Sequence, residues 1–551
     1  MDGSGSPSRR ADVAIVDGRI VQVGECAMGA RETIDAGGLV VAPGFVDLHT
    51  HLDAQSFWDP WLLDSGSHGV TTVVMGNCGF TPAPCRDVDR SRMADYLARV
   101  EGISSGGLRH RVPWNWETFP QYLGALARQA SAVHRATYVG HSALRMFVMG
   151  ERAHSEAATA EEIGAMSALA REALQAGAFG LSTCRRRVNR IAGDLVPPAS
   201  ALAGWDEMLA LASALRGVDD VTLQIANEPL AGDLEARRQQ DEQLLALARA
   251  SGATVTWSLF AGSGQSQHRH RLSLLEQAHR LGLRMHAQVL CRRFDTLFGL
   301  RLGTPFDEAP GWPEWRALLR DEAIRQLHEP ATHDRLACGV QAWEVQRGAR
   351  FDWARTRPLQ GTGRYGQSLA ELAALAGLHP ARVLLSLLRD VSPELIFATT
   401  QANENPADVL ELLRHPHTLV TASDAGATPW KVADGSMQVD LLSHGVRETG
   451  EVPLETAVHW LTRRNALAVG IRDRGLIRPG LAADLIVFDP ARIGSELPQV
   501  AEDSVLGPRL MQQPRGLHRT VVAGEVTWRD GEATAARPGR LLRRERARIA
   551  K

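Results

Sequence analysis

Ala42-Pro-Gly-Phe-Val-Asp-Leu-His49-Thr-His51 is the stretch of this chain that says most about its fold. The Pro-Gly pair interrupts the strand-like residues before it, and residues 45–48 predict a short buried strand. Side chains two positions apart on a strand share a face, so His49 and His51 point in the same direction. Two imidazoles at this spacing can chelate one divalent ion; the alternative is a pair of hydrogen-bonded polar histidines. Their place at the end of a strand favours the metal site.

The residues after this strand alternate short apolar runs with amphipathic segments, a pattern typical of βα units around a parallel sheet. The candidate strands are residues 44–49, 70–75, 136–139, 178–181, 221–225, 254–259, 284–289 and 419–423, with 395–400 as a ninth candidate. Strands that are apolar throughout indicate that both faces of the sheet are covered. We therefore expect an α/β fold built on a (β/α)8 TIM barrel, with the active site at the carboxyl ends of its strands.

The two ends of the chain resemble each other and differ from the middle. Residues 11–24 predict two strands joined by Asp17-Gly18, a strong hairpin signal, and residues 483–489 and 520–531 are also rich in β-forming residues. We expect a small β-sandwich domain from residues 1–42 and 477–536, and a catalytic barrel from residues 43–476. Residues 537–551 are basic and are expected to form a solvated C-terminal tail.

Asp424 ends the last apolar run and precedes the small residues Ala425-Gly-Ala427. An acid in this position could cap the following helix. In a barrel that already carries the two histidines, it could instead bind the metal and accept a proton from a bound water. The small residues after it leave room for a substrate.

Charge and composition argue against several classes of partner and location. The formal net charge of −2 gives no electrostatic reason to expect nucleic acid or an anionic membrane surface. No apolar run approaches the length of a membrane span, and the N-terminus lacks the pattern of a secretory signal. The six cysteines are scattered without CxxC spacing, which favours a reducing compartment. We expect a cytoplasmic protein with a small-molecule substrate; its oligomeric state is left open.

Several further motifs carry a resemblance that covers almost the whole chain. They are residues 43–51, the segment Gly69–Phe80 (GVTTVVMGNCGF), Gly140–Arg145 (GHSALR) with Val148–Glu151, Gly180–Thr183, Ser423–Gly426 (SDAG) and Arg474–Asp489 (RGLIRPGLAADLIVFD). With these motifs the chain resembles the amidohydrolase superfamily, and within it the N-acyl-D-amino-acid deacylase (D-aminoacylase-like) group. The resemblance implies a β-sandwich plus TIM barrel, a Zn²⁺ site and hydrolysis of an N-acyl bond. It also implies that His49 and His51 are metal ligands and that Asp424 is both ligand and general base.

The metal ligands of the resembling group are only partly present. Many superfamily members bridge two metals with a carboxylated lysine, but the only lysines here are Lys431 and Lys551, neither on a middle strand. The D-aminoacylase-like group uses a cysteine near the second strand instead, and Cys78 stands at that place; the alternative is a buried, inert cysteine. The group also has a histidine on each of two middle strands, where residues 221–227 and 254–260 have none. We expect one tightly bound Zn²⁺, with a second ion uncertain.

Substrate-binding residues are harder to assign. Arg292 resembles the arginine that receives the substrate carboxylate in the group, and His141, Arg145 and His286 are weaker candidates, as is the run Arg185–Arg187. The favoured function is a metal-dependent amidohydrolase that cleaves an N-acyl amide by metal-activated water, with Asp424 as base. Two alternatives stay open: a hydrolase of a cyclic amide, carbamate or ureide, and a degenerate barrel that only binds a ligand.

Overall fold

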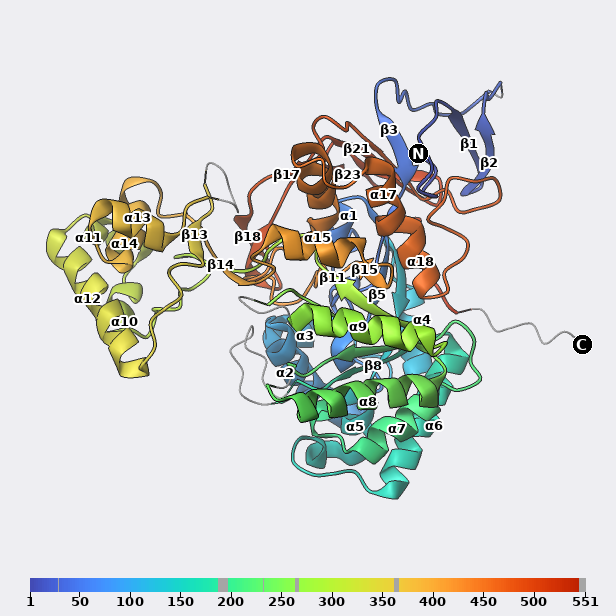
Figure 1. The fold of residues 1–551 in the computed structure, drawn as a ribbon, viewed down its shortest axis with the longest axis horizontal. Coiled ribbons are helices and arrows are strands. Elements are labelled where there is room, and N and C mark those ends of the chain that lie inside the picture. The colour runs from blue at the N-terminus through green and yellow to red at the C-terminus, as the bar shows by residue number, and fades with distance from the viewer. Residues whose placement is uncertain (28, 187–196, 231, 263–266, 361–365, 545–551) are drawn as a thin grey trace, which may run out of the picture.

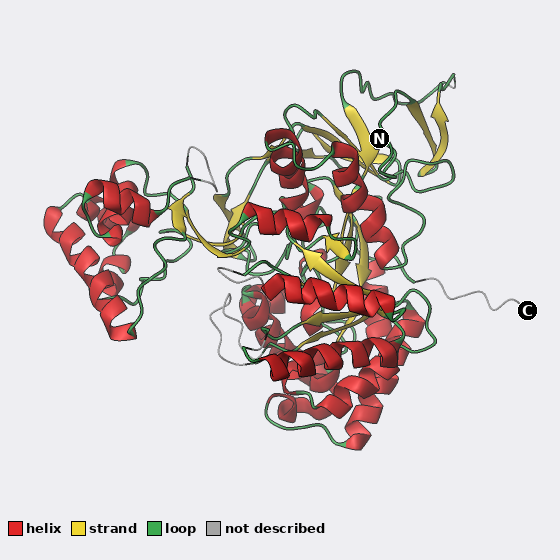
Figure 2. Ribbon diagram, viewed as in Figure 1, coloured by secondary structure: helices red, strands yellow, loops and turns green. Residues whose placement is uncertain are grey.

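The computed structural model describes residues 1–27, 29–186, 197–230, 232–262, 267–360 and 366–544. In the central part of the chain, parallel strands lie inside a layer of helices (Figures 1 and 2). The helices of this layer are α1 (Leu63–Gly66), α2 (Arg90–Glu101), α3 (Ser105–Arg111), α4 (Phe119–Ala127), α5 (His141–Met149), α6 (Ala160–Ala176), α7 (Trp205–Ser213), α8 (Leu234–Ser251), α9 (Gln267–Arg280), α15 (Pro406–Arg414), α16 (Met437–Asp440), α17 (Leu454–His459) and α18 (Asn465–Ala468).

The parallel strands pair in the order in which they follow one another in the chain. They are β4 (Phe45–Asp47), β5 (Val70–Met75), β6 (His134–Thr137), β7 (Val139–Gly140), β8 (Gly180–Cys184), β9 (Thr222–Ala226), β10 (Thr254–Ser258), β11 (Met285–Val289) and β15 (Thr418–Val420). The pairs run β4–β5–β6 and β7–β8–β9–β10–β11–β15, and Tyr138 alone separates β6 from β7. A parallel bridge between Thr50 and Ala425 joins the end of β4 to the residues after β15. These parallel strands match the eight expected ones if β6 and β7 are counted as one strand. The bridge brings the ends of the first strand, β4, and the last strand, β15, together.

Local sequence signals explain several of these elements. The side chain of Thr159 accepts from Glu162 N, and the Glu162 side chain accepts in return, so a capping box begins α6. Asn405 caps α15 ahead of Pro406.

Both ends of the chain build one antiparallel sheet, with strand order β23-β22-β21-β16-β3. Its strands are β3 (Val40–Pro43), β16 (Leu485–Phe488), β21 (Leu517–Val522), β22 (Glu525–Arg529) and β23 (Glu532–Ala533). The predicted hairpin is also present: β1 (Asp12–Val16) pairs with β2 (Arg19–Gly24), and Asp17 and Gly18 turn with φ values of 49° and 75°. Two short hairpin-like pairs, β17 (Gly494–Ser495) with β20 (Pro514–Arg515) and β18 (Gln499–Asp503) with β19 (Gly507–Met511), extend from this region.

A lobe between β11 and β15 was not expected from the sequence. It holds β12 (Phe294–Phe298), β13 (Thr356–Pro358), β14 (Phe397–Ala402), α10 (Trp312–Arg316), α11 (Arg320–Leu327), α12 (Pro330–Arg347), α13 (Leu369–Ala376) and α14 (Pro380–Asp390). It projects from the rest of the molecule (Figure 1, left) and has its own aromatic core around Phe306, Trp312 and Trp315. The ninth candidate strand, residues 395–400, belongs to this lobe, because β14 pairs antiparallel with β12 and β13. The central region expected at 43–476 is therefore interrupted by an insertion.

The expectation of a solvated C-terminal tail is wrong for its first half. Gly539 N donates to Ser131 O, and the residues around Leu541 run parallel to Arg135 at the start of β6. Leu542 packs against an apolar cluster that includes Val46. Residues 545–551 lie outside the described residues.

In the described part of the chain, no single helix is long and apolar enough to cross a membrane. Only α13 and α14 taken together, bent by 94°, reach that length and composition.

Candidate metal centre

His49 and His51 follow β4 directly, and their side chains are almost fully buried. Both Nε2 atoms face the same oxygen, because Asp424 Oδ1 lies 3.2 Å from Nε2 of His49 and 3.3 Å from Nε2 of His51. Cys78 Sγ lies 3.4 Å from His49 Nε2. The structure thus brings together the four residues that the sequence singled out as metal ligands.

Asp424 and Cys78 both adopt backbone conformations that L-residues rarely take. Their φ values are 54° and 56°, in the left-handed region. The backbone of Asp424 is held by a hydrogen bond from its N–H to His49 O, and Cys78 N donates to Gln224 Oε1 over 2.7 Å. A Cβ at position 426 would lie 2.7 Å from His51 O, so the close approach of this segment to His51 requires glycine. Strain of this kind persists where surrounding contacts enforce it, and it is typical of functional sites.

The second ring nitrogen of each histidine has an oxygen partner. His49 Nδ1 lies 2.5 Å from Gln288 Oε1, and His51 Nδ1 lies 2.9 Å from Glu101 Oε1. A carboxylate can only accept, so His51 carries a proton on Nδ1, and Nε2 is the nitrogen that can bind an ion once its own proton has left; Gln288 Oε1 favours the same arrangement in His49. This is the arrangement that metal-binding histidines need.

Glu101 was missed by the sequence reasoning, although a signal for it existed. It is the last residue of α2, followed by Gly102 in the left-handed conformation that ends helices. An acid at a helix C-terminus opposes the helix dipole and is unfavourable unless something compensates for it. An acid in such a position is therefore a candidate for a role outside the helix.

The charges in the centre depend on one another. Burial opposes ionisation of Asp424, but hydrogen bonds from His49 and His51 and their positive charges hold its pKa well below the usual range. Burial also opposes protonation of His49, but the charge of Cys78 and the hydrogen bond with Asp424 raise its pKa to about 10. Burial would raise the pKa of Cys78, yet the neighbouring His49 lowers it to about 7. In the absence of an ion, protons on the histidines supply the positive charge that the carboxylate and thiolate require.

The donor set fits a zinc ion. Ligand atoms at about 2.0–2.1 Å from zinc in tetrahedral geometry are about 3.3 Å apart. The two Nε2–Oδ1 distances of 3.2 and 3.3 Å match this separation, and the longer 3.4 Å to Cys78 Sγ suits the longer bond to sulfur. Imidazole, carboxylate and thiolate are all ligands that zinc accepts.

His141 and Arg145, two of the expected substrate-binding residues, are not brought to this centre. His141 Nε2 lies 2.8 Å from Glu207 Oε1, and its Nδ1 lies 2.9 Å from Thr183 Oγ1. Arg145 forms an ion pair with the same Glu207. All of these side chains are buried, so they stabilise the packing of α5 and α7 on β8 rather than face a substrate.

Arg292 and His286 have neighbours that the sequence did not indicate. The guanidinium of Arg292 is buried and forms ion pairs with Asp434 and Asp440, so its charge is already neutralised. His286 lies near the start of β11, where its ring stands 6.4 Å from that of His417. Of the weaker run of arginines, Arg185 forms an ion pair with Glu228, and Arg187 lies outside the described residues.

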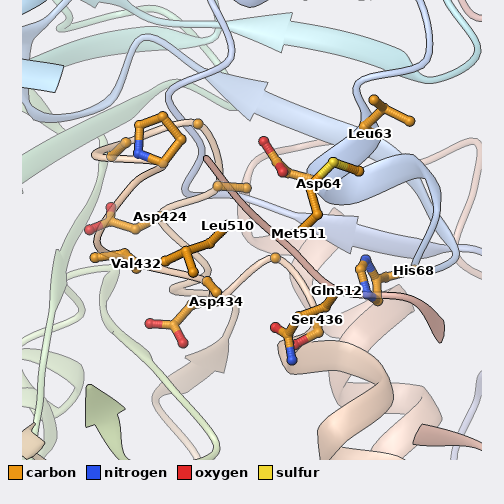
Figure 3. A pocket seen from close by; sticks show the side chains of 16 residues that line it. Leu63, Asp64, His68, Asp424, Val432, Asp434, Ser436, Leu510, Met511 and Gln512 are labelled. Atoms are coloured by element: carbon orange, nitrogen blue, oxygen red, sulfur yellow. The ribbon is translucent and has the colours of Figure 1, made fainter. Parts of the chain in front are cut away.

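A pocket opens beside Asp424, whose side chain is 34% exposed. Figure 3 shows its lining. Among the lining residues are Asp64, His68, Asp434, Ser436 and Gln512. His68 is buried, and burial lowers its pKa to about 4, so it is neutral near pH 7. The pocket opens onto the exposed side of the Asp424 carboxylate.

Comparison with known proteins agrees with the resemblance drawn from the sequence. The chain is 30% identical to N-acyl-D-aspartate deacylase of Alcaligenes xylosoxydans xylosoxydans over 98% of this chain and 93% of that protein. A solved D-aminoacylase shares 27% identity with this chain, with a TM-score of 0.65 over 98% of both chains. That relative has a binuclear metal centre, in which one metal activates and the second attenuates. An N-acyl-D-glutamate deacylase from Bordetella bronchiseptica, solved with zinc and a phosphonate inhibitor, shares the fold at 24% identity and a TM-score of 0.64, over 98% of this chain and 97% of that one. The model of the amidohydrolase family matches residues 32–532, and the chain therefore belongs to the amidohydrolase family.

Proposed function

We propose that this chain hydrolyses an N-acyl amide bond of a small molecule with one Zn²⁺ held by His49, His51 and Asp424, and with Cys78 close enough to join them. The observation that carries the proposal is the convergence of both Nε2 atoms on a single oxygen of Asp424. Membership of the amidohydrolase family supports the reaction class, hydrolysis of carbon–nitrogen bonds other than peptide bonds.

The names of the relatives support the choice of substrate. They act on N-acyl-D-aspartate and N-acyl-D-glutamate or are D-aminoacylases. We infer an N-acyl-D-amino acid or a compound like it. The parallel strands, joined through the Thr50–Ala425 bridge, are proposed to form the (β/α)8 barrel of this family, with the terminal strands as its β-sandwich.

Zinc at this site would lower the pKa of a water molecule to about 7 and polarise a carbonyl oxygen. The residues of the chain then have separate tasks. His49 and His51 hold the ion through Nε2, because their Nδ1 atoms are committed to Gln288 and Glu101. Asp424, ionised and open to the pocket, accepts the proton of the attacking water on its carboxylate and donates it to the nitrogen of the leaving amine.

A single ion is proposed because the middle strands present carboxamides and hydroxyls. Gln224 on β9 accepts a hydrogen bond from Cys78 N at its Oε1. Gln288 on β11 accepts one from His49 Nδ1 at its Oε1. Between them, β10 contributes Thr256 and Ser258. Neutral amides and hydroxyls are poor zinc ligands compared with imidazole or thiolate.

The second candidate function, hydrolysis of a cyclic amide, carbamate or ureide, rests on Arg292. A carboxylate of an acyl-amino acid could bind this guanidinium only by displacing Asp434 or Asp440. A cyclic substrate without a carboxylate would need no such exchange.

The experiment is a hydrolysis screen of zinc-loaded protein against N-acyl-D-amino acids, their L-enantiomers and cyclic ureides, with metal-stripped protein as control. We expect zinc-dependent release of amine from the N-acyl-D series. Turnover of cyclic ureides alone would establish the second candidate, and zinc binding without turnover of any class would favour a ligand-binding protein.

A further inference from the structure

Glu101 occupies an electrostatically unfavourable position. It is the last residue of α2, where the helix dipole is negative, and it is only 6% exposed. Asp424, a second carboxylate, contacts the other nitrogen of the same His51 ring, with its Oδ1 3.3 Å from Nε2. A buried carboxylate in such a place costs stability unless hydrogen bonds and a positive charge offset it.

The end of α2 contacts the candidate centre in two ways. The Glu101 carboxylate accepts a hydrogen bond from His51 Nδ1 at 2.9 Å. Its backbone oxygen accepts from Thr428 N, and the oxygen of Gly102 accepts from Trp430 Nε1 at 2.8 Å. Thr428 and Trp430 belong to the segment that follows Asp424. One helix end thus touches a residue that follows β4 and the loop that follows β15.

The two histidines differ in the partner of their second nitrogen. His51 has a carboxylate at Nδ1, whereas His49 has the neutral carboxamide of Gln288. A carboxylate partner fixes the ring and makes the opposite nitrogen a stronger electron donor; removal of such partners typically lowers metal affinity about 10–100-fold. The two rings are therefore unequal donors.

We propose that Glu101 is a positioning residue of the metal centre, which strengthens His51 as a ligand through Nδ1 while the end of α2 holds the loop that carries Asp424. This inference rests on the proposed function, because it requires that the centre binds a metal. Burial of the Glu101 charge at a helix end is then explained by the ion that it helps to hold.

The test is the zinc dissociation constant of Glu101→Gln, measured by competition with a chelator, together with the visible absorption spectrum of Co²⁺-substituted protein. Glutamine keeps the shape and an accepting oxygen but removes the charge, which makes the surroundings of His51 resemble those of His49. We expect the dissociation constant to rise about 10–100-fold and the Co²⁺ bands to shift. Gln288→Glu supplies the reciprocal change and is expected to lower the dissociation constant.

Asp59→Asn is the matched control. Asp59 is also a buried carboxylate, but it bonds to Gln55 and Leu63 and contacts none of the four candidate ligands. We expect wild-type zinc affinity and Co²⁺ spectrum in this variant.

The outcomes separate the two proposals. A wild-type protein that binds neither Zn²⁺ nor Co²⁺ would overturn the proposed function itself. Zinc binding by wild type with an unchanged affinity and Co²⁺ spectrum in Glu101→Gln would overturn the positioning role alone. If Glu101→Gln does not fold, Gln288→Glu decides, because unchanged affinity there would contradict the dependence of donor strength on the charge of the partner.

Discussion

Asp424 and His49 hold each other through both backbone and side chain. Asp424 N donates to His49 O over 3.1 Å, and Asp424 Oδ1 lies 3.2 Å from His49 Nε2. One residue follows the first strand of the parallel series and the other follows the last. The same contacts that join the ends of the series therefore assemble the centre, so that the site exists only when the series is complete.

Replacement of either histidine by alanine is expected to remove zinc and activity while leaving the fold intact. His49→Ala and His51→Ala each delete one Nε2 donor from a set in which both face Asp424 Oδ1. Elemental analysis and an amide hydrolysis assay measure the loss, and far-UV circular dichroism checks the fold. Full activity in a metal-stripped variant would contradict the assignment.

Asp424→Asn is expected to preserve shape and lose the base. Loss of a general base typically lowers the rate on the order of 10²–10⁴-fold. We expect a fall in kcat of this size with zinc at least partly retained, because both histidines remain. A variant as fast as wild type would show that another group accepts the proton.

The sequence predicted the centre better than the surroundings of the centre. His49 and His51 could be placed because strand alternation and a strand end are local features. The partners Glu101 and Gln288 come from α2 and β11, and only the three-dimensional fold brings them to the two Nδ1 atoms. The ion pairs of Arg292 could not be foreseen for the same reason, since Asp434 and Asp440 reach it from residues after β15.

The insertion between β11 and β15 shows where the apolar pattern of the sequence does not predict which strands pair. Residues 395–400 have the apolar character of a barrel strand, but β14 pairs with β12 and β13 in a separate lobe. Strand patterns carry no information on partner choice, which is decided by contacts distant in sequence. The C-terminal residues near Leu541 were misjudged for a related reason, because the backbone of Arg135 offers them hydrogen bonds that no local pattern reveals.

Zinc binding is expected to release protons and to strengthen as the pH rises. The pKa of His49 is about 10 in the absence of an ion, so its ring carries a proton at neutral pH that must leave before it binds metal. The pKa of Cys78 is about 7, so the thiol is partly protonated at neutral pH and releases its remaining protons as well. Calorimetric titrations of zinc in buffers of different ionisation enthalpy measure the protons released. An affinity that stays constant between about pH 6 and pH 9 would contradict this coupling.

Asp484→Asn is expected to destabilise the junction between the terminal sheet and the parallel strands. Asp484 is buried and accepts from Arg474 Nη1 at 2.7 Å and from Ala523 N at 2.8 Å, and it lies 3.2 Å from His134 Nε2. Breaking a buried pair by removal of one partner typically costs about 3–5 kcal/mol. Urea denaturation followed by fluorescence measures the change, with Asp530→Asn on the surface as the control.

The same contacts predict an acid-sensitive stability. Burial opposes ionisation of Asp484, but the charges of His134 and Arg474 hold its pKa well below the usual range. A carboxyl whose pKa is lowered by folding stabilises the native state above its unfolded pKa of about 3.9 and loses this contribution as the pH falls below it. The wild-type free energy of unfolding should therefore decline below about pH 4 more steeply than that of Asp484→Asn. Parallel acid profiles would show that Asp484 is not responsible.

One zinc ion per chain is the last expectation, and it separates this protein from relatives with binuclear centres. Zinc needs about four ligands. His49, His51 and Asp424 supply three protein ligands and leave one position for water, and Cys78 lies in the same cluster as the two histidines. The sequence excludes a carboxylated lysine on a middle strand. The side-chain oxygen of Gln224 on β9 already accepts a hydrogen bond from Cys78 N, and that of Gln288 on β11 accepts one from His49 Nδ1. A second ion bound to these oxygens would have to break the contacts that hold the ligands of the first.

Elemental analysis after extensive dialysis should therefore give close to one equivalent. Gln224→His with Gln288→His offers the matched gain of function, because it places imidazoles on two middle strands; we expect it to retain additional zinc. Two retained equivalents in wild type would show that ligands outside these residues complete a second site, and the single-ion mechanism would have to be abandoned.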